Sequence, residues 1–359
     1  MLNADPWRGM PVFLTGHTGF KGSWLALWLR EWGAQVHGYA LDPATTPSLY
    51  EQAAVAGTMA SDTRGDLADL AAMQAAMLKA QPTVVFHLAA QALVRPSYAN
   101  PLATFATNVM GTGHVLEAVR NVPSVKAVVV VTTDKVYDNR EWVYPYRESD
   151  ALGGHDPYSA SKGAAEIVTA SYRASFFPGT GGHAARIATA RAGNVIGGGD
   201  WAPERLVPDC LAAFADGRPV QLRYPGAVRP WQHVLEPLSG YLQLAQTLLE
   251  PSGTRAAKGF NFGPDASGDA TVATVAQEMA RLWGGNARVE MPDGTQHPHE
   301  AGQLRLDITQ ARAELGWRPR WALADALRAT VEWHKAWRRD EDTAALTRGQ
   351  IHQYLEAGA

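Results

Sequence analysis

The chain has 359 residues, of which 46% are hydrophobic and 19% charged, and its formal net charge is −3. This composition excludes a disordered chain, and the small net charge gives no electrostatic reason to expect nucleic acid or a membrane surface as a partner. The single cysteine, Cys210, excludes an internal disulfide framework and suits a reducing compartment. Because no apolar run approaches the roughly 20 residues of a membrane helix and residues 1–10 lack a signal-peptide core, we expect a cytoplasmic protein.

The N-terminal half alternates short apolar runs with helix-like stretches. Residues 11–15 predict a strand that stops at Gly16, residues 20–32 predict a helix, and residues 34–40 predict a second strand. Such a strand, turn, helix and strand form a βαβ unit with a right-handed crossover. The alternation continues with further strands and helices, expected at 82–87, 98–120, 125–131, 157–177 and 184–192. The pattern predicts an α/β protein with a Rossmann-type, doubly wound parallel sheet.

A glycine-rich turn follows the first predicted strand and opens the first predicted helix. It consists of Gly16, His17, Thr18, Gly19, Phe20, Lys21 and Gly22. Glycines let the backbone approach a pyrophosphate closely, and the helix N-terminus offers free amide donors. The alternative is a tight turn that binds no ligand. Within the turn, Lys21 could lie beside the phosphates or be a solvated residue of the first helical turn, and the sequence leaves both open.

The residues after the second predicted strand bear on the choice of dinucleotide. Asp42 is at about the distance expected for the acidic residue that binds the adenosine ribose hydroxyls. Residues 38–44 contain no arginine or lysine that could bind a 2′-phosphate. We therefore expect NAD as the cofactor rather than NADP.

The composition and the pattern of the sequence change near residue 190. Glycine, proline and tryptophan become frequent, and the strict alternation is lost. We expect an NAD-binding domain over residues 10–190, to which residues 235–250 return as a flanking helix. Residues 191–340 are expected to form a smaller C-terminal α/β lobe that binds the substrate.

Tyr158 and Lys162 are four residues apart and so share one face of a predicted helix. A phenol is a poor base at neutral pH, but a nearby ammonium and a positively charged oxidised nicotinamide favour the phenolate. That phenolate could take a proton from a hydroxyl while hydride leaves the same carbon. The alternative is chance, because the spacing itself is common in helices.

The glycine turn and the tyrosine–lysine pair resemble the short-chain dehydrogenase/reductase superfamily. The spacing of the turn and the long C-terminal region resemble its extended branch, whose members act largely on nucleotide sugars. The resemblance implies that Asp66 and Leu67 surround the adenine, and that a second group lines the cofactor or braces the helix of Tyr158: Ala89, Ala90, Gln91, Asn108 and Thr132.

The segment from Thr132 to Lys135 follows the fifth predicted strand, where it should face the nicotinamide. Thr133 could hydrogen-bond the sugar oxygen that is oxidised. A 4,6-dehydratase also needs an acid for the departing 6-hydroxyl and a base for the proton on carbon 5. Asp134 can be the acid if burial raises its pKa, and Lys135 can be the base only if its pKa is depressed. The alternative for this pair is a surface ion pair at a strand end.

Asp-Lys at this point, where many 4,6-dehydratases carry Asp-Glu, resembles the CDP-glucose 4,6-dehydratases. Residues 16–24, 135–142, 191–201 and 229–237 agree with that resemblance, whereas Val136 departs from an expected cysteine at a position that we expect only to pack. The resemblance implies NAD-dependent conversion of CDP-D-glucose to CDP-4-keto-6-deoxy-D-glucose, a step in deoxysugar and O-antigen biosynthesis. Carbon 4 is oxidised, water leaves across carbons 5 and 6, and hydride returns to carbon 6. It also implies a homodimer or higher homo-oligomer.

The resemblance further assigns residues to the substrate: Gln91, Asn194, Trp201, Arg229, His233 and His299. Arg229 suits a phosphate, because its planar fork can bind one with two hydrogen bonds. His297 and His299 lack other clustered ligands, so a loop that contacts the substrate is favoured over a metal site, and no metal is expected. Three alternatives stay open: a nucleotide-sugar epimerase, a 4,6-dehydratase of another nucleotide sugar, and a non-catalytic NAD-sensing regulator.

Overall fold

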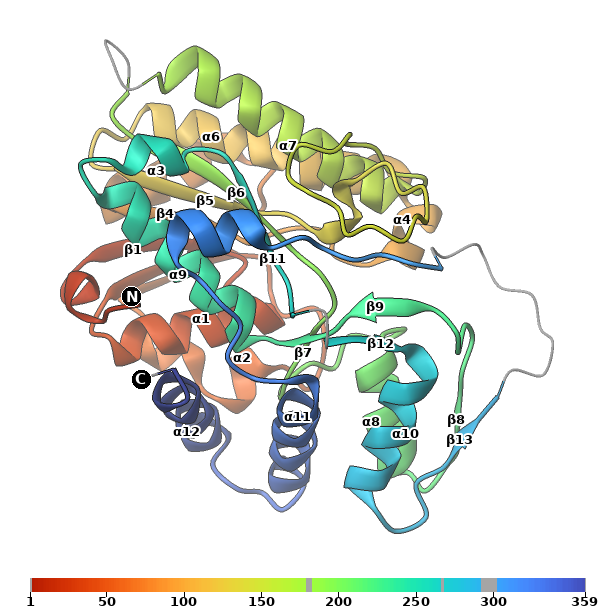
Figure 1. Ribbon diagram of the computed structural model, residues 1–359. Coiled ribbons are helices and arrows are strands. Elements are labelled where there is room, and N and C mark those ends of the chain that lie inside the picture. The colour runs from red at the N-terminus through yellow and green to blue at the C-terminus, as the bar shows by residue number, and fades with distance from the viewer. Residues whose placement is uncertain (1, 179–182, 266–267, 292–301, 359) are drawn as a thin grey trace.

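A central parallel sheet covered by helices on both faces forms the larger part of the molecule, as Figure 1 shows. The computed structural model describes residues 2–178, 183–265, 268–291 and 302–358. The seven strands run in the order β11-β6-β5-β4-β1-β2-β3, and every neighbouring pair is parallel. They are β1 (Pro11–Thr15), β2 (Gln35–Ala40), β3 (Ser61–Arg64), β4 (Val84–His87), β5 (Ala127–Val131), β6 (Arg186–Ala192) and β11 (Gly259–Phe262). The predicted doubly wound parallel sheet is confirmed.

The central strands are apolar on both faces because helices cover both. In β1, Val12 and Leu14 belong to the cluster under α1 (Phe20–Glu31) and α9 (Leu235–Leu249). Phe13, between them, belongs to the cluster on the opposite face. That face is covered by α3 (Leu70–Ala80), α6 (Gly111–Arg120) and α7 (Pro157–Phe176). This two-sided burial explains why these strands appear in the sequence as continuous apolar runs.

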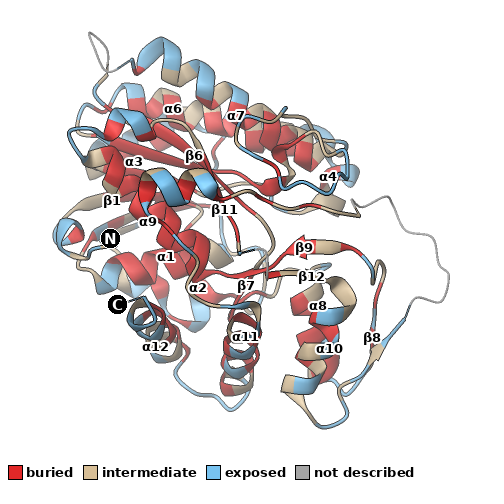
Figure 2. Ribbon diagram, viewed as in Figure 1, coloured by how far each residue is buried: buried red, intermediate tan, exposed pale blue. Residues whose placement is uncertain are grey.

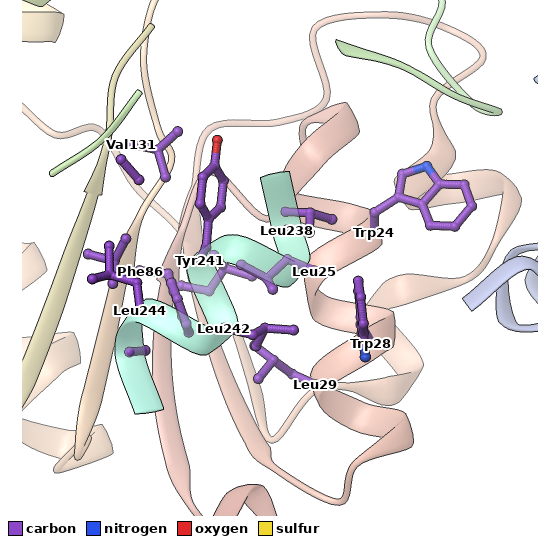
Figure 3. Packing of buried hydrophobic residues seen from close by; sticks show 14 of the residues in the cluster. Trp24, Leu25, Trp28, Leu29, Phe86, Val131, Leu238, Tyr241, Leu242 and Leu244 are labelled. Carbon is purple, nitrogen blue, oxygen red and sulfur yellow. The ribbon is translucent and has the colours of Figure 1, made fainter. Parts of the chain in front are cut away.

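Helix α9 packs into the sheet beside α1, although more than 200 residues separate them in the chain. Figure 3 shows Leu238 and Leu242 of α9 beside Leu25 and Leu29 of α1. Nearly every residue of α9 is buried (Figure 2), as expected for a helix that is apolar around most of its circumference. The helix lies where residues 235–250 were predicted to return to the sheet.

The single helix predicted over residues 98–120 is wrong. The structure has α4 (Val94–Ala99), α5 (Pro101–Phe105), the π-helical turn η3 (Ala106–Met110) and then α6. The break falls at Asn100, whose φ of −136° and ψ of 67° are not helical. The cause is Pro101, which lacks an N–H and restricts the residue before it, so it begins a new helix instead of continuing the old one.

The smaller lobe has its own core between α8 (Leu206–Ala215) and α10 (Val272–Trp283), and Cys210 is buried there. This part of the chain also contains three two-stranded sheets. They pair β7 (Val195–Ile196) with β10 (Gln232–His233), β8 (Val220–Gln221) with β13 (Val289–Glu290), and β9 (Val228–Pro230) with β12 (Asp269–Thr271). Figure 1 shows the lobe beside one end of the sheet. A division of the chain at residue 191 stays a prediction.

The C-terminal helices α11 (Leu323–Trp337) and α12 (Thr343–Glu356) return toward α1. Trp333, Ile351 and Tyr354 belong to the same buried cluster as α1. The remaining short elements are η1 (Asp5–Trp7), α2 (Leu49–Gln52), η2 (Val55–Thr58), η4 (Asp134–Val136), η5 (Gly253–Ala256) and η7 (Ala311–Leu315). Within the described parts of the chain, no helix has the length and apolar character needed to cross a membrane.

Candidate active site

A cavity of about 570 Å³ lies between the sheet and the smaller lobe. Its walls come from the turn after β1, the segments after β4 and β5, the first turn of α7, and residues of α8 and β8. In doubly wound proteins, ligands bind in the crevice outside the carboxyl ends of the parallel strands, which is where this cavity opens.

The glycine turn forms one end of the cavity. Gly16 has a φ of +79°, and a Cβ there would lie 2.6 Å from the backbone nitrogen of Ala89. Helix α1 begins after Gly19, which gives its first turn no side-chain cap, and Gly19, Phe20, Lys21 and Gly22 line the cavity. Uncapped amides at a helix N-terminus suit a phosphate, so the residues present fit a dinucleotide.

We expect Gly16→Ala to weaken dinucleotide binding and to destabilise the fold. The alanine would hold a strained positive φ and push against the backbone at Ala89, at a cost of about 1–3 kcal/mol. Titration calorimetry with NAD and thermal unfolding measure the two effects, and Gly57→Ala, which has open space around it, is the control. Unchanged NAD affinity in Gly16→Ala would show that this turn does not hold the cofactor.

The other predicted cofactor residues fall into two groups. Thr18, Lys21, Asp42, Asp66, Leu67, Ala89, Ala90 and Thr132 line the cavity. Burial lowers the pKa of Lys21 to about 7, with Arg205 and Lys162 acting in the same direction, so this residue is not a solvated surface lysine. Asp42 forms an ion pair with Arg64 at 2.8 Å, an arginine outside the 38–44 segment used to choose between NAD and NADP.

Three predicted cofactor residues do not line the cavity. The ring of His17 is buried under the turn, with Nε2 2.7 Å from Asp62 Oδ1. Asn108 donates to Ser161 Oγ and to the carbonyl of Gln91, so it braces η3 against α7. The Gln91 side chain donates to Thr104 Oγ1. Asn108 thereby braces the helix of Tyr158, as the resemblance implied. A contact of any of these three residues with cofactor or substrate stays a prediction.

The predicted substrate residues also divide. Asn194 and Arg229 line the cavity. His233 is fully buried, with its ring against Trp24 and Trp321, and Trp201 packs against Trp333 and Trp337. Neither residue lines the cavity: the His233 ring packs against α1 and the segment before α11, and the Trp201 ring packs against α11. A role for these two residues in substrate binding stays a prediction. His299 lies outside the described residues, as does His297.

Helix α7 carries Tyr158 and Lys162 to the cavity wall. Asp156 caps the helix by accepting from Ser159 N, and Pro157 occupies the first helical position. Lys162 Nζ donates to the carbonyl of Val131 at the end of β5, 3.1 Å away. Burial lowers the pKa of Lys162 to about 8. Burial raises the pKa of Tyr158 to about 12, and a hydrogen bond with Thr133 opposes that rise.

Asp134 lies beside this pair, at the start of η4. Its side chain is 2% exposed, and its Oδ1 accepts from Thr133 Oγ1 at 2.9 Å. Its Oδ2 is buried and has no hydrogen-bond partner in the described part of the chain. Burial raises the pKa of this carboxyl, while the charge of Lys135 opposes the rise. A carboxyl in this position can hold a proton and present it to a ligand, so Asp134 is not a member of a surface ion pair.

Lys135 lines the cavity next to Asp134, and its backbone nitrogen donates to Thr133 Oγ1. Thr133 also lines the cavity and contacts both Asp134 and Tyr158. The five predicted catalytic residues therefore meet at one wall, where β5 ends.

A buried ion pair behind that wall escaped the sequence analysis. Glu166 of α7 accepts from Arg191 at 2.9 Å, from Thr132 Oγ1 at 2.6 Å and from Thr189 Oγ1 at 2.7 Å. It thereby ties β5, β6 and α7 together directly beneath the catalytic segment. The available signal was Arg191 itself, because a charged residue inside a buried strand needs a charged partner.

No sequence motif pointed to several other charged residues that line the cavity. Arg205 forms an ion pair with Asp200 at 3.1 Å, and Arg223, Asp209 and Glu204 line the region near α8 and β8. In the described part of the chain, no group of three or more histidine, cysteine, aspartate or glutamate side chains could hold a metal ion.

A glycine turn for a dinucleotide, a buried tyrosine–lysine pair and a doubly wound sheet define a member of the extended short-chain dehydrogenase/reductases. The family model described as GDP-mannose 4,6 dehydratase matches residues 13–330, and the chain belongs to this family. It is 50% identical over 359 residues to the CDP-glucose 4,6-dehydratase of Salmonella typhimurium, covering 99% of each chain. It is 31% identical over 280 residues to the dTDP-glucose 4,6-dehydratase of Streptomyces griseus, covering 76% of this chain and 78% of that one.

Solved structures show the same fold. The UDP-glucose 4-epimerase of Thermotoga maritima aligns with a TM-score of 0.75 at 22% identity, over 91% of this chain and 99% of that one. The dTDP-glucose 4,6-dehydratase of Bacillus anthracis, solved in complex with NAD, aligns with a TM-score of 0.75 at 21% identity, over 93% and 99%. Because both reactions occur on this fold, the choice between them depends on the site.

Proposed function

We propose that the chain is an NAD-dependent CDP-glucose 4,6-dehydratase, which converts CDP-glucose to CDP-4-keto-6-deoxyglucose and water. The observation that carries this proposal is the buried carboxyl of Asp134, whose Oδ2 has no partner among the described residues and lies beside Thr133 and Tyr158. An epimerase has no water to expel and no need for that acid. The 50% identity with a CDP-glucose 4,6-dehydratase supports the choice of nucleotide.

In the first step, Tyr158 takes the proton from the sugar's 4-hydroxyl. The glycine turn and the residues that line the cavity beside it would hold NAD, which would supply the hydride chemistry at carbons 4 and 6. Tyr158 has a pKa raised to about 12 by burial, so it needs nearby positive charge to ionise. The charge of Arg205 acts in that direction, and the hydrogen bond with Thr133 orients the phenol. Lys162 lies on the same helix face as Tyr158 and also lines the cavity.

In the second step, water leaves across carbons 5 and 6. The new 4-ketone acidifies the proton on carbon 5, which passes to a base, and we assign this role to Lys135 because it lines the cavity next to Asp134. The bond between carbon 6 and its hydroxyl breaks as Asp134 donates a proton to the leaving oxygen. Burial favours the protonated carboxyl that this step requires.

A comparison of nucleotide sugars tests the assignment. The protein, supplied with NAD, is incubated separately with CDP-, dTDP-, UDP- and GDP-glucose, and the keto-sugar is measured by its ultraviolet absorbance in alkali. We expect keto-sugar with CDP-glucose at a rate well above the others. Turnover confined to another nucleotide sugar would contradict the nucleotide assignment, and epimerisation without keto-sugar would contradict dehydration.

We also propose that the protein forms a homodimer through α5, η3 and α7, which contact one another. These elements expose Leu102 (83%), Met110 (58%) and Ile167 (60%). Exposed apolar side chains gathered on adjacent helices mark an interaction surface, and a two-fold axis lets one such surface cover its own copy.

Introducing a charge into this face should separate the subunits. We expect Ile167→Glu to shift the mass measured by light scattering from dimer to monomer, because a carboxylate would lose its hydration in the interface. Leu78→Glu, at an exposed leucine of α3, is the control and should stay dimeric. A wild-type monomer, or an Ile167→Glu dimer, would refute this proposal.

A further inference from the structure

The far end of the cavity, away from Tyr158, lies between α8 and the segment that follows β8. Apolar side chains make up much of its wall here: Leu206, Val207, Pro208, Val220, Leu222 and Val272. Two opposite charges stand among them. Asp209 is on α8, Arg223 follows β8, and Asp209 Oδ2 is 3.9 Å from an Arg223 nitrogen. An apolar slot with a few convergent polar groups is typical of a small-molecule subsite.

Asp209 and Arg223 are both held in place by the backbone of Glu204. Glu204 N donates to Asp209 Oδ1 at 3.2 Å, and Arg223 donates to the Glu204 carbonyl at 3.1 Å. Glu204 has a φ of +65°, a conformation that is rare for a residue with a side chain. One hydrogen bond with the Glu204 backbone, accepted by Asp209 and donated by Arg223, fixes the position of each charged group. In the described part of the chain, Asp209 Oδ2 accepts no hydrogen bond and has only the Arg223 nitrogen at 3.9 Å, and Arg223 donates only to the Glu204 carbonyl.

Arg95 also lies at this end, where it pairs with Glu204 at 3.0 Å, whereas two other arginines of the cavity lie nearer to the reaction centre. Arg229 acts on the pKa of Asp134, and Arg205 acts on those of Tyr158 and Lys21. These two arginines are therefore placed for the diphosphate of a nucleotide sugar whose sugar contacts Tyr158. The base, attached beyond the diphosphate, then extends toward α8 and β8.

We infer that Asp209 and Arg223 read the base of the nucleotide and select cytosine. This inference rests on the proposed function, because it assumes a nucleotide sugar in the cavity. The edge of cytosine presents an amino donor at N4 and acceptors at N3 and O2. A carboxylate can accept from N4, and a guanidinium can donate to N3 and O2 with two parallel N–H groups.

Uracil and thymine present the opposite pattern at two of these three positions. Their O4 would face the Asp209 carboxylate, and their N3–H would face the Arg223 guanidinium. The first contact would bring two hydrogen-bond acceptors together, and the second would bring two donors together. Each contact would leave desolvated polar groups without a hydrogen bond. The pair therefore rejects UDP and dTDP sugars as well as favouring CDP sugars, which is how specific sites discriminate.

The test compares CDP and UDP binding by titration calorimetry in wild type, Asp209→Asn and Arg223→Gln. We expect wild type to bind CDP at least about tenfold more tightly than UDP. In Asp209→Asn, CDP affinity should fall about 10- to 100-fold while UDP affinity changes by less than about threefold. Arg223→Gln should also lose CDP preference, and it decides the question if Asp209→Asn does not fold. Asp216→Asn, an exposed residue of the same α8 segment outside the cavity, is the matched control.

A parallel loss of CDP and UDP affinity in both variants would overturn the inference, because it would show that the pair only supports the Glu204 turn. Unchanged preference would overturn it too. The binding assay needs no turnover, so it is separate from the test of the proposed function. A protein that prefers CDP in this pair-dependent way but leaves CDP-glucose unchanged would refute the dehydratase proposal alone. Turnover of CDP-glucose with an unchanged Asp209→Asn preference would refute the base-reading role alone.

Discussion

Asp134→Asn should reduce formation of the keto-deoxy sugar by about 10²- to 10⁴-fold, the usual contribution of a positioned general acid. An amide cannot donate the proton that the departing 6-hydroxyl needs. It has nearly the shape of the carboxyl, so the hydrogen bond to Thr133 and the fold should survive. Oxidation at carbon 4 depends on Tyr158 and should continue. We therefore expect single-turnover experiments to show absorbance of reduced cofactor without the alkali absorbance of the keto-deoxy product.

The matched control is Asp138→Asn, four residues further along and outside the residues that line the cavity. It should retain wild-type rates. Unchanged product formation by Asp134→Asn would remove the feature that separates a dehydratase from an epimerase, and the epimerase would become the better interpretation.

Tyr158→Phe should slow both the oxidation and the overall reaction, reducing kcat by about 10²- to 10⁴-fold. Phenylalanine cannot remove the proton of the 4-hydroxyl. The buried ring is retained, and the change removes one hydrogen bond to Thr133, so the melting temperature should change little. Reduced cofactor and keto-sugar should both form only at this lower rate.

Tyr172→Phe on the same helix is the control, since its hydroxyl contacts Glu117 on the side away from the cavity. It should leave kcat intact. A Tyr158→Phe protein that keeps full cellular function would instead support a non-catalytic sensor of NAD.

The sheet could be predicted because its determinants are local. Continuous apolar runs such as Val128–Val131, and the glycines after β1, carry the pattern of a buried parallel strand and of a close turn without reference to the rest of the chain. The break at Asn100 is local too, because Pro101, the residue that ends α4, is visible in the sequence.

Side-chain surroundings could not be predicted in the same way. His233 and Trp201 carry functional groups of the right kind, yet helices far away in sequence close over them. Conversely, Asp209 and Arg223 face the cavity only because β8 is placed beside α8. Spacing along the chain shows only which residues are near one another in sequence. The surroundings of these four side chains depend on tertiary packing, which the spacing does not reveal.

Lys135 of the Asp-Lys pair is the proposed base of the dehydration step. Lys135 shares the cavity wall with Asp134, so acid and base can act on adjacent carbons of one sugar. The dehydratase account needs both groups there at once, and the reaction product reports on both.

The most direct measurement is therefore the product formed from CDP-glucose and NAD in D₂O, analysed by NMR. The account predicts CDP-4-keto-6-deoxyglucose with deuterium at carbon 5, because the proton removed there exchanges with solvent before carbon 5 is protonated again. It also predicts that hydrogen from carbon 4 of the substrate appears in the new methyl group at carbon 6. CDP-galactose as the product, or unchanged CDP-glucose, would contradict the account.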